Sequence, residues 1–454
     1  MKVRRFLLDM IRALIVNLAV FSILPVVLAC RKEVEPVLVV SETEIDMPYV
    51  AGEYTISLDA TMLWIVRVDH SSENEEWITF PGGMSGQPED HTLTIRLPEN
   101  PGHDRTAILT IALKGTVEYK KVPIRQEGYL DMDMRDELDP ELTACWMAQN
   151  PSWEKITRYD ILTCKSLTLF GLSSSATLKG LHLFPVLESL FLRNCEFSSP
   201  SFGEIPWLKS IYFDACTIAS LDLTGNEGLE SLTFTDTSLK TLDTRSNPAL
   251  FSVNFDTRDR FPDIEVVRLG PGVEFFTACN AHVLRELDCS VAENLTYLEV
   301  PNCDIHRLDL SKTQIAALEI RMNPIDELLL PPTLERLMMH QCTGSISRLD
   351  IGDAAVSITV SGTTITELSF GNAASLSYVY CCNNLLSHLD LSHLSLPEYL
   401  SFGGNPGASG VFELLVSPVD YPAAQAQYDG MSWWLDISPV VTHVISKPRI
   451  PEGD

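Results

Sequence analysis

Hydrophobic positions between residues 160 and 410 repeat with a period close to 21 residues. The repeated phrase is apolar-x-x-apolar-x-apolar. Four successive copies begin at Leu187, Leu208, Leu229 and Leu250. A fixed period of this length predicts a solenoid of stacked repeats. We expect about eleven full turns, with a twelfth starting near Leu167-Thr168-Leu169.

A second phrase, Leu-Asp followed by one more strand residue, is nested between copies of the first, as in Leu308-Asp309-Leu310. A strand therefore recurs about every ten residues, and ten residues cannot hold a strand, two turns and a helix. Each turn should carry two short strands on opposite faces. The pattern resembles the nested, short-period leucine-rich repeats of bacteria, which implies a solenoid flatter and straighter than a horseshoe.

One position in each turn, five residues after the central apolar residue, mostly carries Asn, Cys or Thr. In leucine-rich repeats this position forms an inward ladder that bonds to the backbone of neighbouring turns, and all three residue types can serve. Arg258 cannot, so the turn at 253–262 is expected to be distorted. The expected ladder residues are Cys195, Cys216, Thr237, Asn280, Cys303, Asn323, Cys342, Thr363, Asn384 and Asn405.

The eleven cysteines of the chain first suggest a disulfide framework. Four of them fall on the ladder, however, and Cys289 and Cys381 fall on inward strand positions. Buried free thiols behave as small hydrophobic groups. We therefore expect few or no disulfides.

Residues 37–129 alternate with period 2 in short segments separated by turn residues, which predicts a small β-sandwich. The order Trp64, Trp77-Ile78, a glycine-rich turn and a closing Ile124-Arg125-Gln126-Glu127-Gly128 resembles the BACON domain, an immunoglobulin-like module of Bacteroidetes surface proteins. That family was proposed to bind carbohydrate, and a spacer role is the alternative. Trp64 and Trp77 are either sugar-stacking or core residues, and their strand segments favour the core.

Residues 130–159 are expected to hold an acidic linker and a capping helix. Asp139-Pro140-Glu141 predicts a helix start, and the helix would run to about Gln149. Such a helix could close the exposed end of the solenoid. Its buried side would carry Leu142, Cys145 and Trp146.

The period is lost after about residue 410. Residues 411–454 are expected to form a C-terminal cap and tail. Trp433-Trp434, together with Val411-Phe412 and Leu414-Leu415, would cover the last coil.

Residues 1–29 have a basic start and an apolar stretch, which predicts a secretory signal peptide too short for a retained transmembrane helix. Their end, Val27-Leu28-Ala29-Cys30, resembles the lipobox of bacterial lipoproteins, which implies a lipid anchor on Cys30; an ordinary signal peptide is the alternative. Residues 30–36 would be anchor and tether, and they partly resemble the surface-export signal of Bacteroidetes lipoproteins. We expect an outer-membrane protein, at the cell surface rather than on the periplasmic face.

Charge and motifs narrow the classes of function. The chain has 33 Lys and Arg against 61 Asp and Glu, a formal charge of −28, and removal of residues 1–29 leaves −31. This balance argues against nucleic-acid binding and against a membrane contact held by charge alone. The sequence contains no HExxH, Gly-x-Ser-x-Gly, phosphate-loop or paired CxxC motif, so we expect neither an enzyme nor a cofactor.

Binding is expected on outward strand positions, where adjacent turns stack about 4.8 Å apart. Tyr and Arg often dominate binding energy, and ordinary cross-strand stacking is the alternative. The expected patch contains Arg336, Met338, His340, Tyr378, Tyr380 and Tyr399. On the second strand, a column of Asp residues is either solvated or relieved by calcium, with Asp288 and Asp309 as the calcium candidates.

The sequence thus predicts a mostly β protein, with an immunoglobulin-like β-sandwich followed by a leucine-rich-repeat solenoid of about two short strands per 21-residue turn. Its expected function is non-catalytic binding of a protein partner at the cell surface. Glycan binding within a polysaccharide-utilisation system is the alternative, and a structural spacer is the third possibility.

Overall fold

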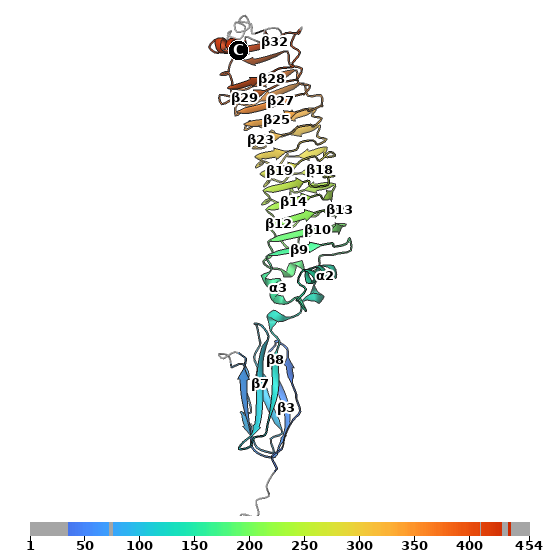
Figure 1. Ribbon diagram of the computed structural model, residues 1–454, viewed down its shortest axis with the longest axis vertical. Helices are drawn as coiled ribbons and strands as arrows, with labels where there is room; N and C mark the ends of the chain where they lie inside the picture. Colours follow the sequence, from blue (N-terminus) through green and yellow to red (C-terminus); the bar gives the residue numbers. More distant parts are fainter. Residues whose placement is uncertain (1–34, 72–75, 409, 429–434, 437–454) are drawn as a thin grey trace, which may run out of the picture. The chain divides into compact units, whose positions relative to one another are not determined.

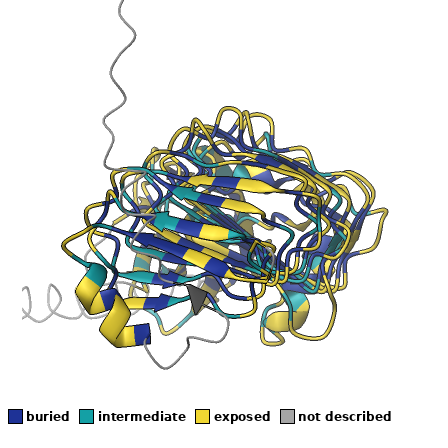
Figure 2. Cartoon of the chain, turned by 90° about the horizontal axis from the view of Figure 1, so that it is seen from above, coloured by how far each residue is buried: buried dark blue, intermediate teal, exposed yellow. Residues whose placement is uncertain are grey.

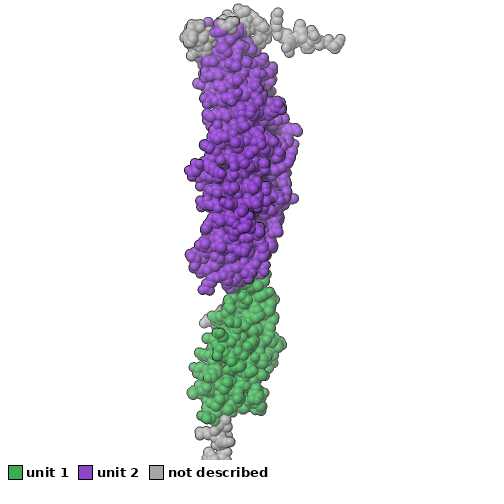
Figure 3. Space-filling model, turned by 90° about the vertical axis from the view of Figure 1, so that its right-hand side faces the viewer, with its two compact units in different colours: residues 1–132 green, residues 133–454 purple. Residues whose placement is uncertain are grey.

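The computed structural model describes residues 35–71, 76–408, 410–428 and 435–436. The chain forms two compact units, Met1–Met132 and Asp133–Asp454, which Figure 3 distinguishes by colour. Cys30 and Trp433-Trp434 lie outside the described residues. Within the described part of the chain, no helix has the length and apolar character needed to span a membrane.

Unit 1 consists of two β-sheets around one hydrophobic core. One sheet has the order β1-β3-β6 and the other β2-β8-β7-β4-β5, with every pair antiparallel except β2 and β8. Alternate residues of each long strand enter the core, as the period-2 pattern requires. The strands are β1 (Leu38–Val40), β2 (Ile45–Met47), β3 (Gly52–Ala60), β4 (Trp64–His70), β5 (Ser85–Gly86), β6 (Thr92–Leu97), β7 (Arg105–Leu113) and β8 (Tyr119–Gln126).

Both tryptophans singled out in the sequence lie in this core. Trp64 and Trp77 expose 2% and 4% of their surface. A Cβ on Gly86 would approach the Trp64 ring to 2.2 Å, and the guanidinium of Arg105 lies 4.6 Å over the Trp77 ring. Neither ring has an open face for a sugar, so the core interpretation holds and the sugar-stacking one is wrong.

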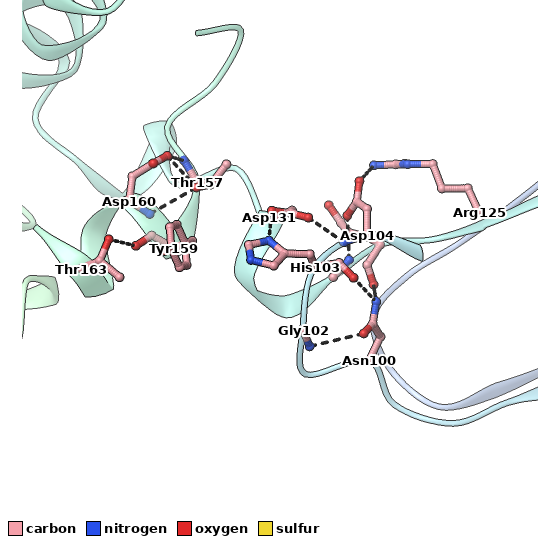
Figure 4. A network of polar contacts seen from close by, with 12 residues as sticks. Asn100, Gly102, His103, Asp104, Arg125, Asp131, Thr157, Tyr159, Asp160 and Thr163 are labelled. Atoms are coloured by element: carbon pink, nitrogen blue, oxygen red, sulfur yellow. Dashed lines mark hydrogen bonds and ion pairs between the residues drawn. The ribbon is translucent and has the colours of Figure 1, made fainter. Parts of the chain in front are cut away.

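Side chains tie the turn before β7 to the segment that follows β8 (Figure 4). The amide of Asn100 donates to the carbonyls of His103 (2.8 Å) and Glu127 (3.2 Å). The Asp131 carboxylate accepts from the backbone N–H of Asp104 (2.6 Å) and contacts the His103 ring (2.9 Å). These bonds fix the backbone where the chain passes through the short helix η1 (Tyr129–Asp131).

Unit 2 contains a parallel sheet of twelve strands in which each turn of the solenoid adds one strand (Figure 1). The expected twelfth turn is confirmed, since β9 pairs in register with β10. The strands are β9 (Ser166–Phe170), β10 (Ser189–Arg193), β12 (Ser210–Asp214), β14 (Ser231–Thr235), β17 (Ser252–Asp256), β19 (Phe275–Ala278), β21 (Tyr297–Glu299), β23 (Ala317–Glu319), β25 (Arg336–His340), β27 (Ser357–Ser361), β29 (Tyr378–Tyr380) and β31 (Tyr399–Ser401).

Shorter strands form the second face, as the nested Leu-Asp phrase predicts. Buried and exposed residues alternate along the strands of the solenoid (Figure 2). The second-face strands pair in five small sheets: β11-β13-β15 (Glu196–Phe197, Thr217–Ile218, Ser238–Leu239), β16-β18-β20 (Thr241–Asp243, Val266–Arg268, Glu286–Asp288), β22-β24 (Arg307–Asp309, Glu327–Leu329), β26-β28 (Arg348–Ile351, Glu367–Phe370) and β30-β32-β33 (His388–Leu391, Phe412–Val416, Leu435–Asp436).

The expected ladder positions point inward at the corner after each main strand. Asn384 donates to the carbonyls of Val360 (2.8 Å) and Cys381 (3.0 Å), and its Oδ1 accepts from the backbone N–H of Thr363 (3.0 Å). Cys342 donates its S–H to the Ile320 carbonyl (3.1 Å). Asn bridges two turns as donor and acceptor, whereas a thiol satisfies chiefly a carbonyl.

Two turns depart from the regular ladder, one near Asn280 and one at residues 253–262. Asn280 is not the inward residue: it has φ 58° and is half-buried, and its neighbour Ala281 is fully buried. The prediction for Asn280 is therefore wrong by one residue. The turn at 253–262 is distorted as expected, because Arg258 is exposed and the Asp236 carboxylate accepts the backbone N–H groups of residues 258, 259 and 260.

A second set of inward amides was not predicted. Asn226 donates to the carbonyls of Phe202 (2.7 Å) and Ile205 (3.0 Å), and Asn247 donates to those of Leu223 and Asn226 (both 2.9 Å). Both residues are fully buried. The signal in the sequence is that both asparagines lie 21 residues apart, three residues before the leucine of the next phrase.

Helix α2 (Pro140–Gln149) covers the first edge of the twelve-stranded sheet, and its predicted range and buried residues are confirmed. Asp139 caps the helix by accepting from the N–H of Glu141 (2.9 Å). The Cys145 thiol accepts from the N–H of Phe170 (3.1 Å), and Gln149 donates to the Thr168 carbonyl (2.7 Å). Edge groups of β9 are thus satisfied, which protects the edge from further pairing.

Two further helices were not predicted. Helix α3 (Arg158–Thr163) starts with a capping box between Thr157 and Asp160 (Figure 4). Helix α4 (Tyr421–Tyr428) covers the other end of the sheet, where the Tyr428 hydroxyl donates to the Leu400 carbonyl (2.9 Å). The short helices η2 (Arg135–Glu137) and η3 (Leu181–Leu183) complete the set of described elements.

The ten cysteines in the described residues are all free, as the ladder interpretation expects. Cys289 and Cys381 are buried as expected, each at the residue that follows its strand, β20 or β29. Burial raises the pKa of the Cys289 thiol to about 12, so the group stays protonated at neutral pH.

We predict that Asn384→Ala destabilises the solenoid by about 3 kcal/mol or more, because each buried polar group left unpaired costs about 1–3 kcal/mol. Urea unfolding of the full chain measures the change in the free energy of unfolding. Hydrogen exchange in β27 and β29 shows whether the loss of stability is local to these strands. Asn383→Gly is the matched control, because Asn383 has φ 56°, which glycine adopts freely. Equal effects of the two substitutions would contradict the ladder role.

Candidate binding face

Two columns of side chains point outward from the twelve-stranded sheet, because its strands pair in register. The first column contains the residues that open each strand: Ser166, Ser189, Ser210, Ser231, Ser252, Phe275, Tyr297, Ala317, Arg336, Ser357, Tyr378 and Tyr399. The central column lies two residues further along: Thr168, Phe191, Tyr212, Thr233, Asn254, Thr277, Glu299, Glu319, Met338, Thr359, Tyr380 and Ser401.

The structure brings all six residues of the expected patch onto this face, but not into one continuous cluster. They lie on β25, β29 and β31, and β27 intervenes with the small residues Ser357, Thr359 and Ser361. The two halves are therefore separated by one strand of small side chains. Each half has its own internal contacts.

Tyr378 and Tyr399 form the better-defined half. Their rings stack with centroids 4.6 Å apart and planes 8° apart. Tyr380 lies beside them in the central column, and the proximity of Cys382 raises its pKa. In the other half, the His340 ring contacts the Ser361 hydroxyl at 2.5 Å. The two tyrosine rings are thus already stacked in the free chain.

A charged cluster next to the patch was not predicted as a site. The Tyr297 hydroxyl donates to Glu299 (2.7 Å), Arg321 pairs with Glu319, and the Cys279 thiol lies 3.6 Å from Glu299. The bond to Glu299, with burial, raises the pKa of Tyr297 to about 12. Burial and Glu299 raise the pKa of Cys279 to about 11. Both groups are neutral at pH 7 and neither is an activated nucleophile.

The Asp column of the second face stabilises turns. Asp309 accepts from the N–H (3.0 Å) and hydroxyl (2.6 Å) of Ser311, and Asp288 accepts from the N–H of Ser290 (2.9 Å). These bonds to donors two residues ahead lower the pKa of both carboxyls and mark Asx-type turns. Lys312 lines the small hollow between the two carboxylates.

The calcium hypothesis for Asp288 and Asp309 gains no support from their surroundings. Across the described residues, no group of three or more His, Cys, Asp or Glu side chains could hold a metal ion. Calcium takes six to eight oxygen ligands, and the carboxylates already accept local hydrogen bonds. Turn formation accounts for both residues.

The fold defines a class: the chain is a mostly β protein with a parallel β-solenoid of about 12 turns. No protein-family model and no curated protein matches the chain. Similarities to solved structures do exist, at low sequence identity.

Two leucine-rich-repeat proteins are among the similar solved structures. The functional domain of InlJ from Listeria monocytogenes, which includes a cysteine ladder, has 19% identity and a TM-score of 0.45 over 60% of this chain; the chain spans 61% of that domain. YopM from Yersinia enterocolitica WA-314 has 19% identity and a TM-score of 0.30, over 63% of this chain and 82% of that one.

A third similar structure is a GH5 xyloglucanase of Bacteroides ovatus in complex with a XXXG heptasaccharide. It has 12% identity and a TM-score of 0.19, over 35% of this chain and 36% of that one. All three TM-scores are low, and we base the class on the strand register of this chain.

We predict that Glu299→Gln lowers the pKa of Tyr297 from about 12 towards its ordinary value of 10, because the phenol loses its anionic acceptor. In the native chain the stabilisation from this bond is fully present below pH 10 and is lost as the pH rises through about 12. Tyrosinate absorbance of the folded chain against pH measures the shift.

Glu327→Gln on the second face is the control for this titration. The Glu299→Gln variant and the native chain should differ in their tyrosinate titration curves. This difference should vanish when Tyr297→Phe is introduced into both chains. If the difference between the titration curves persists in the Tyr297→Phe background, the pKa shift belongs to another tyrosine.

Proposed function

We propose that the outward face of the twelve-stranded sheet binds a protein partner. The observation that carries the proposal is the stacked pair Tyr378–Tyr399, with ring centroids 4.6 Å apart, on the same face as exposed Arg336 and Met338, from which one strand of small residues separates it. Tyr399 exposes 46% and Met338 42% of its surface. Tyrosine and arginine are enriched among the residues that dominate protein-binding energy, and side chains already ordered lose less entropy on binding.

The same geometry supports a protein partner over a glycan. A sugar ring packs on the open face of an aromatic ring, and the stacking of Tyr378 on Tyr399 leaves each ring only one face for such packing. Trp64 and Trp77, the other candidates for sugar stacking, are buried in unit 1. The hydroxyl groups and edges of the tyrosines suit the mixed polar and apolar surface of a protein.

The role we propose is non-catalytic. The polar groups at the centre of the face already have partners: Tyr297 donates to Glu299, and Arg321 pairs with Glu319. Cys279 and Tyr297 are both protonated at neutral pH, as their raised pKa values require. This arrangement supports recognition by shape and charge.

We also propose that the protein is displayed on the outer membrane of a Bacteroidetes-like bacterium through a lipid on Cys30. The lipobox-like Val27-Leu28-Ala29-Cys30 supports the anchor. Unit 1 would be a BACON-like stalk, and its buried tryptophans support a spacer rather than a sugar-binding module. A charge of −31 on the remaining chain leaves lipid as the means of membrane attachment.

The binding face is tested with a displayed peptide library selected on the native full-length chain. We predict that Tyr378→Ser combined with Tyr399→Ser weakens binding of the selected peptides about tenfold or more, the effect of losing a hot spot. Arg307→Ser with Glu327→Ser, an exposed pair on the second face, is the matched control and should leave binding unchanged.

Two outcomes would overturn the proposal for the face. Peptides that bind the tyrosine variant as tightly as the native chain would show that Tyr378 and Tyr399 do not contribute to binding. A glycan-array signal that disappears in the tyrosine variant, with no peptide enriched, would assign the face to sugars.

The anchor is tested by metabolic labelling with a palmitate analogue in a Gram-negative host. We predict that Cys30→Ala abolishes label incorporation and releases the protein from the membrane fraction, because the thiol is the acceptor of the first lipid. Cys164→Ala, a cysteine of the solenoid unit, should label normally. Retained label in Cys30→Ala would show that the anchor assignment is wrong.

A further inference from the structure

The outward face has a gap in its first column. Ala317 of β23 lies in register between Tyr297 of β21 and Arg336 of β25. A methyl group therefore stands where both neighbouring strands present long side chains. This gap is part of a hollow of about 340 Å³ whose lining also includes Glu319, Met338 and, on β27, Ser357 and Thr359.

Over Ala317, the gap between Tyr297 and Arg336 has the width of one aromatic ring. Adjacent strands are about 4.8 Å apart, so β21 and β25 are about two such spacings apart. Where rings occupy adjacent strands of this face they follow the same repeat: Phe191–Tyr212 and Tyr378–Tyr399 each have centroids 4.6 Å apart and planes 8° apart. A ring placed over Ala317 would meet a wall on each side at stacking distance.

The two walls suit a ring in different ways. Tyr297 is held in place by its bond to Glu299 (2.7 Å). Arg336 is exposed, and no carboxylate among the described residues lies within ion-pair distance of it. A guanidinium without a fixed partner can lie flat on an aromatic face, where the ring quadrupole attracts it.

Charges of both signs surround the hollow: Arg336 and Glu319 line it, and Glu299 lies beside Glu319 on the adjacent strand. An ionised partner side chain of either sign would therefore be attracted by one of these charges and repelled by another. A neutral ring with a hydrogen-bond donor, a phenol or an indole, avoids the repulsion and can donate to the Glu319 carboxylate.

We propose that this hollow, the aromatic slot (Tyr297, Ala317, Glu319, Arg336 and Met338), receives one tyrosine or tryptophan side chain of the partner protein. The ring is sandwiched between Tyr297 and Arg336. This inference rests on the proposed protein-binding function and names the chemistry of the partner's anchor residue.

The slot is tested on the full chain with N-acetyl-L-tryptophanamide as probe and N-acetyl-L-leucinamide as the non-aromatic comparison. We expect saturation-transfer NMR to show binding of the tryptophan probe only, with the strongest transfer at the indole. Ala317→Tyr should abolish it, because a ring from the chain itself fills the column. Leu329→Tyr, at an exposed position of β24 on the second face, should not.

Arg336→Ala is the second variant, since it removes one wall without adding bulk to the column. It should weaken the probe about two- to fivefold, the range of an exposed cation–π contact. Hydrogen exchange in β21, β23 and β25 verifies that each variant is folded. Unchanged binding in both variants, or no binding to the native chain, overturns the slot.

The selected peptides separate this proposal from the one on which it rests. Replacing their aromatic residues with Leu should reduce binding to the native chain but not to Ala317→Tyr. Peptides that lose binding in the Tyr378→Ser, Tyr399→Ser variant yet bind Ala317→Tyr normally would overturn the slot alone. Probe binding that depends on Ala317, with no peptide enriched, would support the slot and overturn the protein-binding function.

Discussion

The solenoid depends on how each turn satisfies the backbone at its inward corners. A carbonyl there points into a dry interior where no strand partner reaches it, and a buried group left unpaired is costly. Asn384 and Asn405 solve this by donating to the carbonyls of their own and the preceding turn. The residue before each has a positive φ, Asn383 at 56° and Gly404 at 75°, which aims the side chain inward.

Register follows from this corner, and the chemistry of the outward face follows from register. When every corner is fixed in the same way, neighbouring strands align residue for residue, and outward side chains form straight columns. Identical residues then interact across turns, as in the bond between the Ser189 and Ser210 hydroxyls (2.8 Å). The inward positions are constrained by packing, whereas the outward ones are free to vary. Recognition is therefore expected on the outward columns, whose charged members lie between Glu299 and Arg336 and whose aromatic members include Phe275, Tyr297, Tyr378, Tyr380 and Tyr399 besides the separate pair Phe191–Tyr212.

Much of the fold could be predicted because its signals are local and periodic. The leucine period located the main strands, and Asp139-Pro140 located α2. Asn280 was misplaced because the bulge at 257–262 shifts the count, and either Asn280 or Ala281 fits the period alone. The Asp column was expected to be either solvated or relieved by calcium, yet its recurring Asp-x-Ser or Asp-x-Thr spacing is itself the signal of a turn, as Asp309 and Ser311 show.

The candidate site was harder to predict, because part of it is defined by a residue that is small. A search for binding residues looks for Tyr, Arg and Met, and it found Arg336 and Met338 without the gap at Ala317 beside them. That gap has meaning only once β21, β23 and β25 are known to be neighbours in register. On a face where each strand adds one side chain per column, a missing side chain leaves a slot one ring wide. The same corners that fix the register therefore also set the dimensions of the binding face.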